Sequence, residues 1–454
     1  MATDPRMRFL RNLAAAFGTG EWAAAPLRAA AVRATGGRFR WIAPLVGRLL
    51  TAFPHRPSFA PTLAFLEQDA GLIRACDRMT RRGYDGERFP VRTVFVPPAE
   101  MSRPPAALGP LAIPALATEA ALAAWLGVSA GRLRWYADPA GRNRKHPAGP
   151  LRTYRHRWVP KPGGRRRLLE IPTPGLKRLQ RKILAEILDH VPPHPAAHGF
   201  RPGRSVVTNA APHAGKRVVL RFDLTDFFPS VPAGRVFRTF RTVGYPETVA
   251  RLLAGLCTTR LPADVWDARP NPAADGSEHA ARVRLASRHL PQGAPTSPAL
   301  ANLAAFRLDR RLSRLASLLE ADYTRYADDL TISGGELLAR RVSRVHALVA
   351  EIAADEGFPV NHRKTRVMRR GGRQHVTGVV VNVRPNVPRA EFDRLKAVLT
   401  NCVRRGPASQ NRDGRPDFRA HLAGKVAHVA MVNPTRGRRL WALFDKITWD
   451  KAPG

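Results

Sequence analysis

Apolar residues recur at helical spacing in several parts of the chain. Leu176, Leu179 and Ile183 are three or four positions apart, as on the buried face of a helix. Lysines and arginines lie between them, which fits either a solvated outer face or a face that meets a polyanion. The same spacing predicts one helix over 297–312 and two or three helices over 388–449.

Other apolar runs are short and rich in β-branched residues, as strands are. Such runs lie at 218–222, 324–333 and 376–383. Predicted strands and helices therefore alternate over 218–385, as in an α/β or α+β protein. The polar, proline-containing segment 263–281 predicts a loop.

The first 115 residues are rich in Ala, Pro and Arg and contain helical patches at 41–53 and 62–74. They show no chemistry that we can recognise, so we expect a mainly helical extension of unknown role. Residues 118–136 have the spacing of two short helices around Gly127. That pattern fits either a helical packing unit or a DNA-binding helix-turn-helix.

The chain is strongly basic: its 454 residues include 75 Lys and Arg against 35 Asp and Glu, a formal charge of +40. Only 10 of the 75 are lysines, and the planar guanidinium of arginine suits bidentate contact with phosphate. Residues 151–220 alone carry +12. We therefore expect a nucleic acid partner and no membrane, because no run approaches the roughly 18 apolar residues of a membrane span.

The cysteines, Cys76, Cys257 and Cys402, are too few and too far apart for a disulfide framework or a zinc cluster. The N-terminus lacks the apolar core and cleavage site of a secretory signal. We therefore expect a reducing, cytoplasmic location.

Three acidic residues lie at the ends of predicted strands. Asp223 follows the run 218–222, and Asp328 and Asp329 are adjacent at the tip of a predicted hairpin. Neighbouring carboxylates repel one another unless a cation lies between them. Two Mg²⁺ ions would remove this cost and support in-line phosphoryl transfer. The alternative is ordinary turn chemistry, for which Asp is also suited.

The context of these acids resembles the finger and palm motifs of reverse transcriptases. Five motifs carry the resemblance, in this order: HGFRPGRS (198–205), RFDLTDFFPSV (221–231), LPQGAPTSPALANL (290–303), YTRYADDLTISG (323–334) and VNHRKTRVM (360–368). Two further strings, NAAPH (209–213) and VTG (376–378), are similar to elements of retron reverse transcriptases. The resemblance covers about residues 116–454.

The resemblance implies an α+β fold with the shape of a right-hand polymerase. Its fingers would lie within 116–220, its palm within 221–385 and its helical thumb within 386–454, after the extension 1–115. The thumb, which includes Trp441, would grip an RNA–DNA hybrid by its shape and backbone.

The resemblance also implies a role for the catalytic residues. The carboxylates of Asp223, Asp328 and Asp329 would bind two Mg²⁺ ions, with the backbone carbonyl of Leu224 as a further ligand. Phe228 would collide with a ribose 2′-hydroxyl and so favour deoxynucleotides. Of the adjacent pair Phe227 and Phe228, we expect one to pack in the core, and we expect Asp226 to be a structural turn residue.

Further matching residues would bind the deoxynucleoside triphosphate. Gln292 would contact the incoming nucleotide, and Lys364 would either protonate the leaving pyrophosphate or contact a phosphate. Lys161 and Arg167 would hold the triphosphate, with Arg165 and Arg166 as alternatives to Arg167. The retron-specific strings would hold the cognate RNA through Asn209, His213, Val376, Thr377 and Gly378.

The resemblance implies RNA-templated DNA synthesis on a dedicated structured non-coding RNA. Priming would start from a 2′-hydroxyl of that RNA, and the product would be multicopy single-stranded DNA linked to RNA. The resemblance further implies a role in defence against phage with a separate effector protein. The alternatives are another bacterial reverse transcriptase, of the intron or defence-associated kind, and a non-catalytic RNA-binding scaffold.

Overall fold

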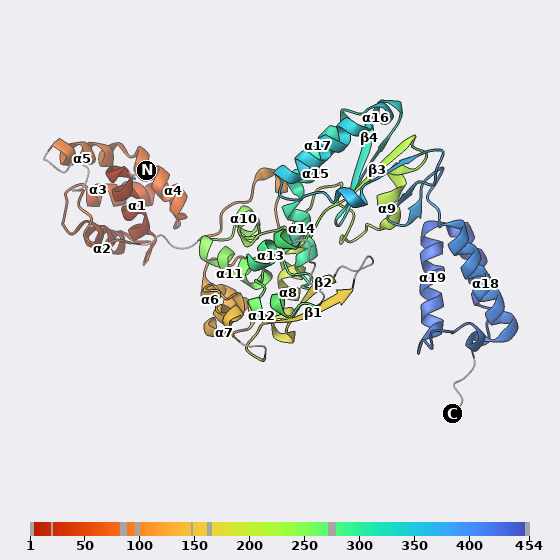
Figure 1. The fold of residues 1–454 in the computed structure, drawn as a ribbon. Helices are drawn as coiled ribbons and strands as arrows, with labels where there is room; N and C mark the ends of the chain where they lie inside the picture. Colours follow the sequence, from red (N-terminus) through yellow and green to blue (C-terminus); the bar gives the residue numbers. More distant parts are fainter. Residues whose placement is uncertain are drawn as a thin grey trace. The chain divides into compact units, whose positions relative to one another are not determined.

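The computed structural model describes residues 4–19, 21–81, 89–95, 100–146, 149–160, 166–270 and 278–449. The chain forms two compact units (Figure 1). The first comprises residues 1–103 with the segments 115–125 and 244–249, and the second comprises the rest.

The first unit is helical in its described part, as the sequence pattern predicted. Its helices are α1 (Pro5–Phe17), α2 (Ala24–Thr35), α3 (Ile42–Ala52), α4 (Phe59–Gln68) and α5 (Ala70–Arg81). They enclose a core of their own that includes Phe9, Leu27 and Leu49. Asn12 lies in this core, where its side chain donates to the Thr93 carbonyl and accepts from the backbone N–H of Phe95.

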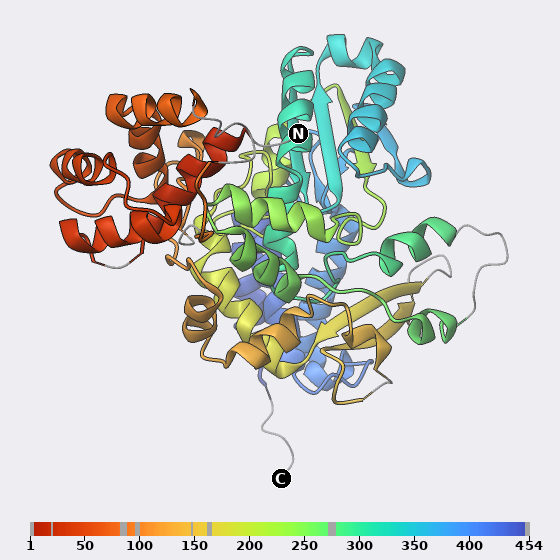
Figure 2. The ribbon, with the colours of Figure 1, turned by 90° about the vertical axis from the view of Figure 1, so that its left-hand side faces the viewer.

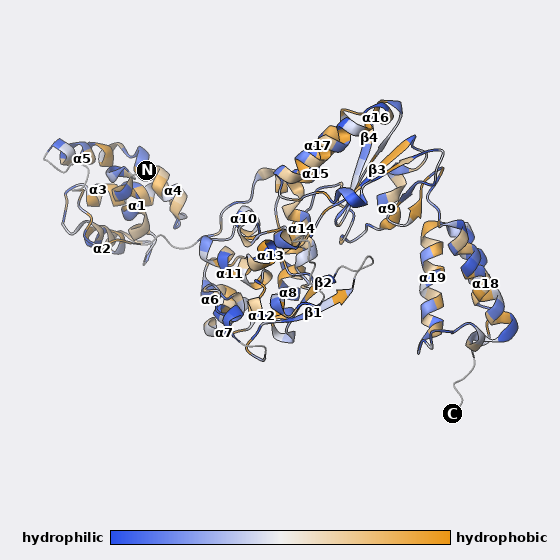
Figure 3. Ribbon diagram, in the orientation of Figure 1, coloured by the Kyte–Doolittle hydropathy of each residue, from blue (hydrophilic) through white to orange (hydrophobic). Residues whose placement is uncertain are grey.

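A four-stranded antiparallel sheet is the centre of the second unit. Its strands are ordered β4 (Ala321–Tyr326), β5 (Asp329–Gly334), β3 (Val218–Asp223) and β6 (Arg366–Arg369). Helices α15 (Phe306–Ser317) and α17 (Val342–Asp355) lie together beside it (Figures 1 and 2). β3 begins with a hydrophobic run (Figure 3), and its residues 218–220 and 222 are buried. The α+β prediction is confirmed.

A two-stranded hairpin and further helices also belong to the second unit. The hairpin is β1 (Tyr154–Pro160) with β2 (Arg166–Pro172). The predicted helix that follows it is α8 (Pro174–Glu186), which buries Leu176, Leu179 and Ile183. The others are α7 (Ala130–Ala137), α9 (Val206–Ala210), α10 (Ala233–Thr242), α12 (Ala263–Asp267), α13 (His279–Ala286), α14 (Ser297–Ala304) and α16 (Glu336–Arg340).

Helices α6 (Glu119–Leu126) and α11 (Glu247–Cys257) begin in segments of the first unit and end in the second. The predicted pair of short helices around Gly127 is confirmed as α6 and α7, with Gly127 at φ 68°.

Three local predictions were wrong. The segment 263–281 is not all loop, because α12 and the start of α13 fall within it. The single helix over 297–312 is broken at Ala305, where ψ is 3°. The strand over 376–383 is instead a tight hairpin of β7 (His375–Val376) and β8 (Val379–Val380). Thr377 and Gly378 turn it with φ of 45° and 83°, the sign that two-residue hairpin turns require.

The C-terminal segment forms three helices, as the pattern predicted: α18 (Arg389–Arg405), α19 (Phe418–Val432) and α20 (Pro434–Phe444). Their apolar faces share one core with Val376 and Val379 of the β7–β8 hairpin. Within the described residues, we find no helix with both the length and the apolarity needed to cross a bilayer.

Candidate active site

The strand register brings the three predicted catalytic acids to one edge of the sheet. Asp223, the last residue of β3, pairs with Asp329, the first residue of β5. Asp328 occupies the turn before β5, and its backbone carbonyl accepts from the N–H of Leu224 at 2.8 Å. Ala327 enters this turn with φ of 56°. The hairpin tip and the end of β3 are thus one structural unit.

The electrostatics of this edge are unfavourable to anions. Burial and the charges of Asp223 and Asp329 raise the pKa of the Asp328 carboxyl above its usual value, and Lys364 only partly offsets them. An ionised Asp328 therefore costs free energy in the protein as it stands. A cation between the carboxylates would relieve that cost.

Two basic side chains already neutralise the other carboxylates. The Lys364 ammonium lies 2.9 and 3.0 Å from the two oxygens of Asp223, from the short 3₁₀ helix His362–Lys364. Arg221, two positions before Asp223, donates to both oxygens of Asp329 at 2.7 and 2.5 Å. The described part of the chain gathers no group of three His, Cys, Asp or Glu that could hold a metal ion.

A fully buried ion pair supports the turn that carries Asp328. Arg325, the penultimate residue of β4, donates to both carboxylate oxygens of Asp309 on α15 at 2.8 and 2.7 Å. Both side chains are 0% exposed. The same guanidinium donates to the carbonyl of Ala327 at 3.1 Å and to the Asn302 side-chain oxygen at 2.9 Å. The turn that carries Asp328 is thereby tied to helices α14 and α15.

The loop of the HGFRPGRS motif packs against the same turn. The Asn302 amide donates to the carbonyl of Gly199 at 2.9 Å. A Cβ on Gly199 would lie 2.6 Å from the backbone nitrogen of Ala327, so only glycine allows this approach. The structure therefore gives this glycine a packing role that the motif alone did not explain.

Sequence reasoning missed Arg325 and Asp309, although each carried a signal. Arg325 lies two positions after the buried Tyr323 on β4, so the two side chains share a face of the sheet. Asp309 lies among the buried residues of an amphipathic helix, beside Leu308 and Leu312. A charged residue at a core position of each element predicts a buried partner of opposite sign.

The two adjacent phenylalanines separate as expected. Phe227 is buried, with the Arg325 guanidinium 5.5 Å from its ring centroid and Phe358 5.4 Å away. Phe228 is only half-buried and lies 6.1 Å from the exposed ring of Phe200. Asp226 has φ of 47° and accepts from Arg284 at 2.6 Å, which agrees with a structural turn residue. Phe228 is thus the ring left available at the surface of the site.

The predicted nucleotide-binding residues lie on two joined elements. Arg167 is exposed on β2, and Arg166, its alternative, is half-buried. β2 is joined to the loop of Gln292, because the N–H of Glu170 donates to the Gln292 carbonyl at 2.9 Å. Lys161 and Arg165 lie outside the described residues.

A buried charge pair, also missed by sequence reasoning, fastens the same two elements. The His289 Nε2 lies 3.0 Å from a carboxylate oxygen of Glu170, and Nδ1 donates to the Ser287 carbonyl at 2.7 Å. Burial alone would lower the pKa of the His289 imidazole, but the charge and hydrogen bond of Glu170 outweigh it and raise that pKa. An imidazolium that donates from both nitrogens therefore fits this site.

The NAAPH segment (209–213) packs against strands β4 and β5 of the sheet. His213 is fully buried, with Nδ1 2.7 Å from the Ser333 hydroxyl and Nε2 2.7 Å from the Thr324 hydroxyl. The Thr324 hydroxyl donates to the carbonyl of Asn209, so it accepts from the Nε2–H of His213. Burial lowers the pKa of this imidazole to about 4. His213 is therefore neutral, and its ring links β4 to β5 through two hydrogen bonds.

The NAAPH and VTG strings meet each other. The Asn209 amide donates to the Thr377 hydroxyl at 3.5 Å, and that hydroxyl donates to the Val206 carbonyl. Asn209, His213 and Val376 have buried side chains, whereas Thr377 is half-buried and Gly378 exposed. The predicted RNA contact thus has surface access at Thr377 and Gly378. The other three residues contact protein.

Comparison with known proteins agrees with this geometry. Residues 159–391, which include all three carboxylates, match the family described as "Reverse transcriptase (RNA-dependent DNA polymerase)". The chain is 45% identical to the Retron Mx65 reverse transcriptase of Myxococcus xanthus, over 72% of this chain and 71% of that protein. It is 38% identical to the Retron Mx162 reverse transcriptase of the same organism, over 72% and 66%. Identity to the Retron Ec86 reverse transcriptase of Escherichia coli is 30%, over 65% and 81%.

Proposed function

The chain belongs to the reverse transcriptase family as a retron-type RNA-directed DNA polymerase, and from this premise we propose that it copies a dedicated structured non-coding RNA into multicopy single-stranded DNA linked to RNA. The observation that carries the catalytic part is the meeting of Asp223, Asp328 and Asp329 at one sheet edge. Burial and the charge of Asp223 raise the pKa of the Asp328 carboxyl, which is consistent with a cation binding at this edge.

Reverse transcriptases use divalent metal ions and deoxynucleoside triphosphates. In our proposal the carboxylates of Asp223, Asp328 and Asp329 hold two Mg²⁺ ions, with the carbonyl of Leu224 as a further ligand. All of these are the oxygen ligands that Mg²⁺ prefers. The ions would activate the attacking hydroxyl and stabilise the leaving pyrophosphate. Lys364 and Arg221 would then have to release the carboxylates of Asp223 and Asp329.

We assign the remaining roles to the chain's own side chains. Lys364, freed from Asp223, would donate a proton from Nζ to the leaving pyrophosphate. Arg167 and Lys161 would bind the triphosphate, and Gln292 would contact the incoming nucleotide from the loop that Glu170 fastens to β2. Phe228 would exclude a 2′-hydroxyl, in keeping with its half-buried place at the site.

We further propose the right-hand arrangement: fingers in 116–220, palm in 221–385 and thumb in 386–454. The extension 1–115 precedes them. Thr377 and Gly378 would contact the cognate RNA. Asn209, His213 and Val376 would hold the β7–β8 hairpin and the sheet in the shape that this contact needs, because their side chains are buried.

Priming from a 2′-hydroxyl of the RNA and a role in antiphage defence with a separate effector are also proposed. Their support is the similarity to several retron reverse transcriptases. A cytoplasmic location is proposed on the same ground.

The test begins with the nucleic acid that co-purifies with the full chain. Sequencing should recover one abundant RNA and a DNA complementary to part of it. The DNA should lose mass with RNase and lose its link to RNA on treatment with a 2′,5′-debranching enzyme. A DNA without such a branch would refute 2′-hydroxyl priming while leaving the polymerase activity intact.

The activity itself is tested by deoxynucleotide incorporation on an RNA template. Asp328→Asn should reduce incorporation by at least about 100-fold, since it removes a charge that acts on the reacting groups. Asp355→Asn is the matched control, because this acid lies exposed at the end of α17. Equal incorporation by the wild type and Asp328→Asn would overturn the catalytic assignment.

A further inference from the structure

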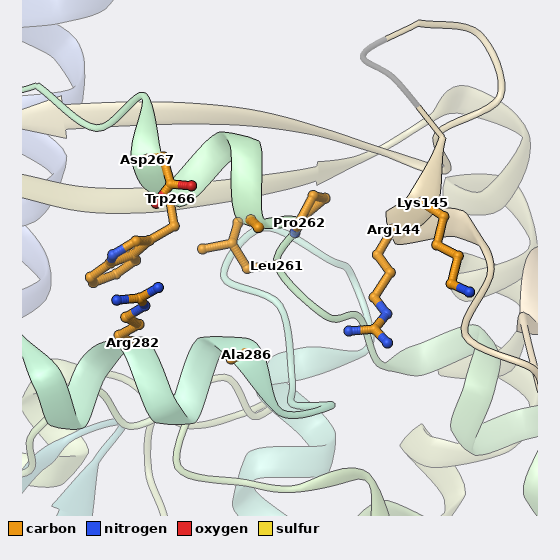
Figure 4. Close-up of a pocket in the computed structure, with 9 residues that line it drawn as sticks. Arg144, Lys145, Leu261, Pro262, Trp266, Asp267, Arg282 and Ala286 are labelled. Carbon is orange, nitrogen blue, oxygen red and sulfur yellow. The ribbon is translucent and has the colours of Figure 1, made fainter.

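A small pocket of about 260 Å³ lies beside α12 and α13 (Figure 4). Leu261 and Trp266 are its buried apolar floor, and Pro262 and Ala286 belong to its walls. The Trp266 ring already contacts one side chain, because the Arg269 guanidinium lies 4.4 Å from the ring centroid. The pocket is thus an apolar recess within a strongly basic protein.

Three cations surround this recess. Arg144 and Lys145 come from the 3₁₀ helix Asn143–Lys145, and Arg282 comes from α13 and points toward Trp266 (Figure 4). All three are exposed, and within the described part of the chain none of them has a side-chain hydrogen bond or an ion pair. Asp267 is the one acid among the lining residues.

Nearby arginines do have acidic partners. Arg269 pairs with Glu278 at 2.9 Å, and Arg284 pairs with Asp226 at 2.6 Å. Arg144, Lys145 and Arg282 have no such partner among the described residues. This is the condition in which guanidinium and ammonium groups are available to phosphate.

The pocket floor is fastened to the β1–β2 hairpin. Arg152 donates to both carboxylate oxygens of Asp264 on α12 at 2.8 Å, and the Trp158 indole donates to the Val265 carbonyl at 3.3 Å. Leu168 of β2 shares a core cluster with the floor residues. These contacts couple the position of α12 to that of β2, the strand that carries Arg167.

The other wall is fastened to the catalytic edge. The Arg284–Asp226 ion pair ties α13 to the turn that follows Asp223. A ligand held between α12 and α13 would consequently be held at a fixed distance from the carboxylates.

We propose that this pocket binds one unpaired nucleotide of the RNA template strand. The base would enter the apolar recess, and its flanking phosphates would contact Arg144, Lys145 and Arg282. Unpaired bases are recognised by contact with apolar side chains and guanidinium planes, whereas paired bases hide their faces in the stack. The inference rests on the RNA-directed activity and not on the retron-specific part of the proposed function.

The pocket's size supports a single base as occupant. Its volume is below the roughly 300–1,000 Å³ of pockets that enclose drug-sized molecules. A template held in this way would have its single-stranded part fixed before it reaches the active site.

The first test removes the cations. Fluorescence anisotropy would measure the binding of a labelled single-stranded RNA and of a blunt RNA duplex as a function of salt. For the triple variant Arg144→Gln, Lys145→Gln and Arg282→Gln, we expect about tenfold weaker single-strand binding. We expect its log–log salt slope to fall by up to about 2, at roughly 0.7 for each lost contact.

The control removes the same charge elsewhere. Arg310 and Arg314 on α15 and Arg344 on α17 are exposed, and none of them forms an ion pair with another described residue. Their triple change to Gln should leave the single-strand slope near the wild-type value. Equal losses in both triple variants would show a general charge effect and overturn the site.

The second test fills the recess without changing charge. Ala286→Trp should weaken single-strand binding severalfold, leave duplex binding unchanged and keep the wild-type salt slope. Ala354→Trp, at an exposed position of α17, is its control. Unchanged single-strand binding by Ala286→Trp would overturn the assignment of a base to the pocket.

A third measurement separates a strand from a free nucleotide. The wild-type chain would be titrated with ATP in the presence of the labelled RNA. Persistence of the RNA complex at millimolar ATP supports the template strand as ligand. Displacement that Ala286→Trp abolishes would identify a mononucleotide site instead and overturn the proposal.

Discussion

Arg325 and Asp309 form a bidentate ion pair with no solvent exposure on either side chain. The Tyr323 hydroxyl donates to the same carboxylate at 2.8 Å. Because Arg325 also donates to the carbonyl of Ala327, the geometry of the turn that carries Asp328 depends on a charge pair in the core as well as on the turn itself.

We predict that breaking this pair is costly. Asp309→Asn or Arg325→Met should each lower the free energy of unfolding by about 3–5 kcal/mol, because the remaining charge is left buried without its partner. Urea denaturation followed by circular dichroism measures this directly. The double variant Asp309→Leu with Arg325→Met should recover much of the stability but not the polymerase activity, since nothing then holds the turn. Full activity in the double variant would contradict the positioning role.

A second prediction concerns Arg221, which occupies both oxygens of Asp329. Arg221→Gln should lower Tm without Mg²⁺, because Asp329 loses its counter-charge beside two other acids. Mg²⁺ should then raise Tm more than in the wild type, since the ion no longer competes with a guanidinium. If Arg221→Gln bound Mg²⁺ tenfold more tightly, saturating Mg²⁺ would increase its free energy of unfolding by about 1.4 kcal/mol more than that of the wild type.

The matched control for Arg221 is Arg217→Gln, whose partner Glu336 lies away from the catalytic edge. Thermal unfolding scans over a Mg²⁺ titration compare the two variants. A Mg²⁺-induced shift no larger in Arg221→Gln than in Arg217→Gln would count against a metal at Asp329.

Phe228 gives a prediction about the sugar. Phe228→Ala should raise the incorporation of ribonucleotides relative to deoxynucleotides on the order of 10- to 100-fold, because the ring that meets the 2′-hydroxyl is removed. Single-nucleotide extension with each triphosphate measures the ratio. Phe227→Ala should instead lower stability, by about 3–5 kcal/mol, because that ring is in the core. An unchanged ratio in Phe228→Ala would exclude the ring as the gate.

His213 predicts a dependence of stability on acid. Its pKa is about 4 in the folded chain against an ordinary value near 6.5, so the unfolded chain binds the proton first as pH falls. The stability that the neutral imidazole contributes is therefore present above about pH 6.5 and lost between there and pH 4. His198, whose pKa is also lowered to about 4, adds to the same window. Urea unfolding at several pH values should show a shallower decline in His213→Gln; an identical decline would refute the prediction.

The Glu170–His289 pair predicts a pH dependence of stability opposite to that of His213. The pKa of His289 is raised, so its contribution is present below about pH 6.5 and lost as pH rises through the folded value. Glu170→Gln should remove this dependence. It should also raise KM for deoxynucleotides more than it lowers kcat, because β2 is less firmly held to the loop of Gln292. Steady-state kinetics on an RNA template would test this, and an effect on kcat alone would be inconsistent with it.

The meeting of Asp223, Asp328 and Asp329 was predictable because all three lie at the ends of strand-like runs in the sequence. A short apolar run ending in Asp223, and a pair of acids between two strand-like runs, place carboxylates at strand ends whatever the surrounding fold. The ordered motifs then indicated the enzyme class. The expectation that one of the adjacent rings Phe227 and Phe228 packs in the core also held, because Phe227 is buried and Phe228 is half-buried.

Other features depend on contacts between distant segments, which no local pattern contains. The Arg325–Asp309 pair joins a strand to a helix, Glu170–His289 joins β2 to a loop more than a hundred residues later, and His213 lies between two strands of the sheet. The VTG segment had the composition of a strand, but its backbone turns at Thr377 and Gly378, and Thr377 meets the distant Asn209 there.

The sequence by itself determined the charge, the alternation of elements and the three acids, because these follow from residue type and spacing along the chain. Only the tertiary structure decided which charges are paired, which motif residues are buried, and that three cations around Trp266 have no described partner. The reason is physical: pairing and burial depend on distances between residues that folding brings together, and chain spacing does not fix those distances.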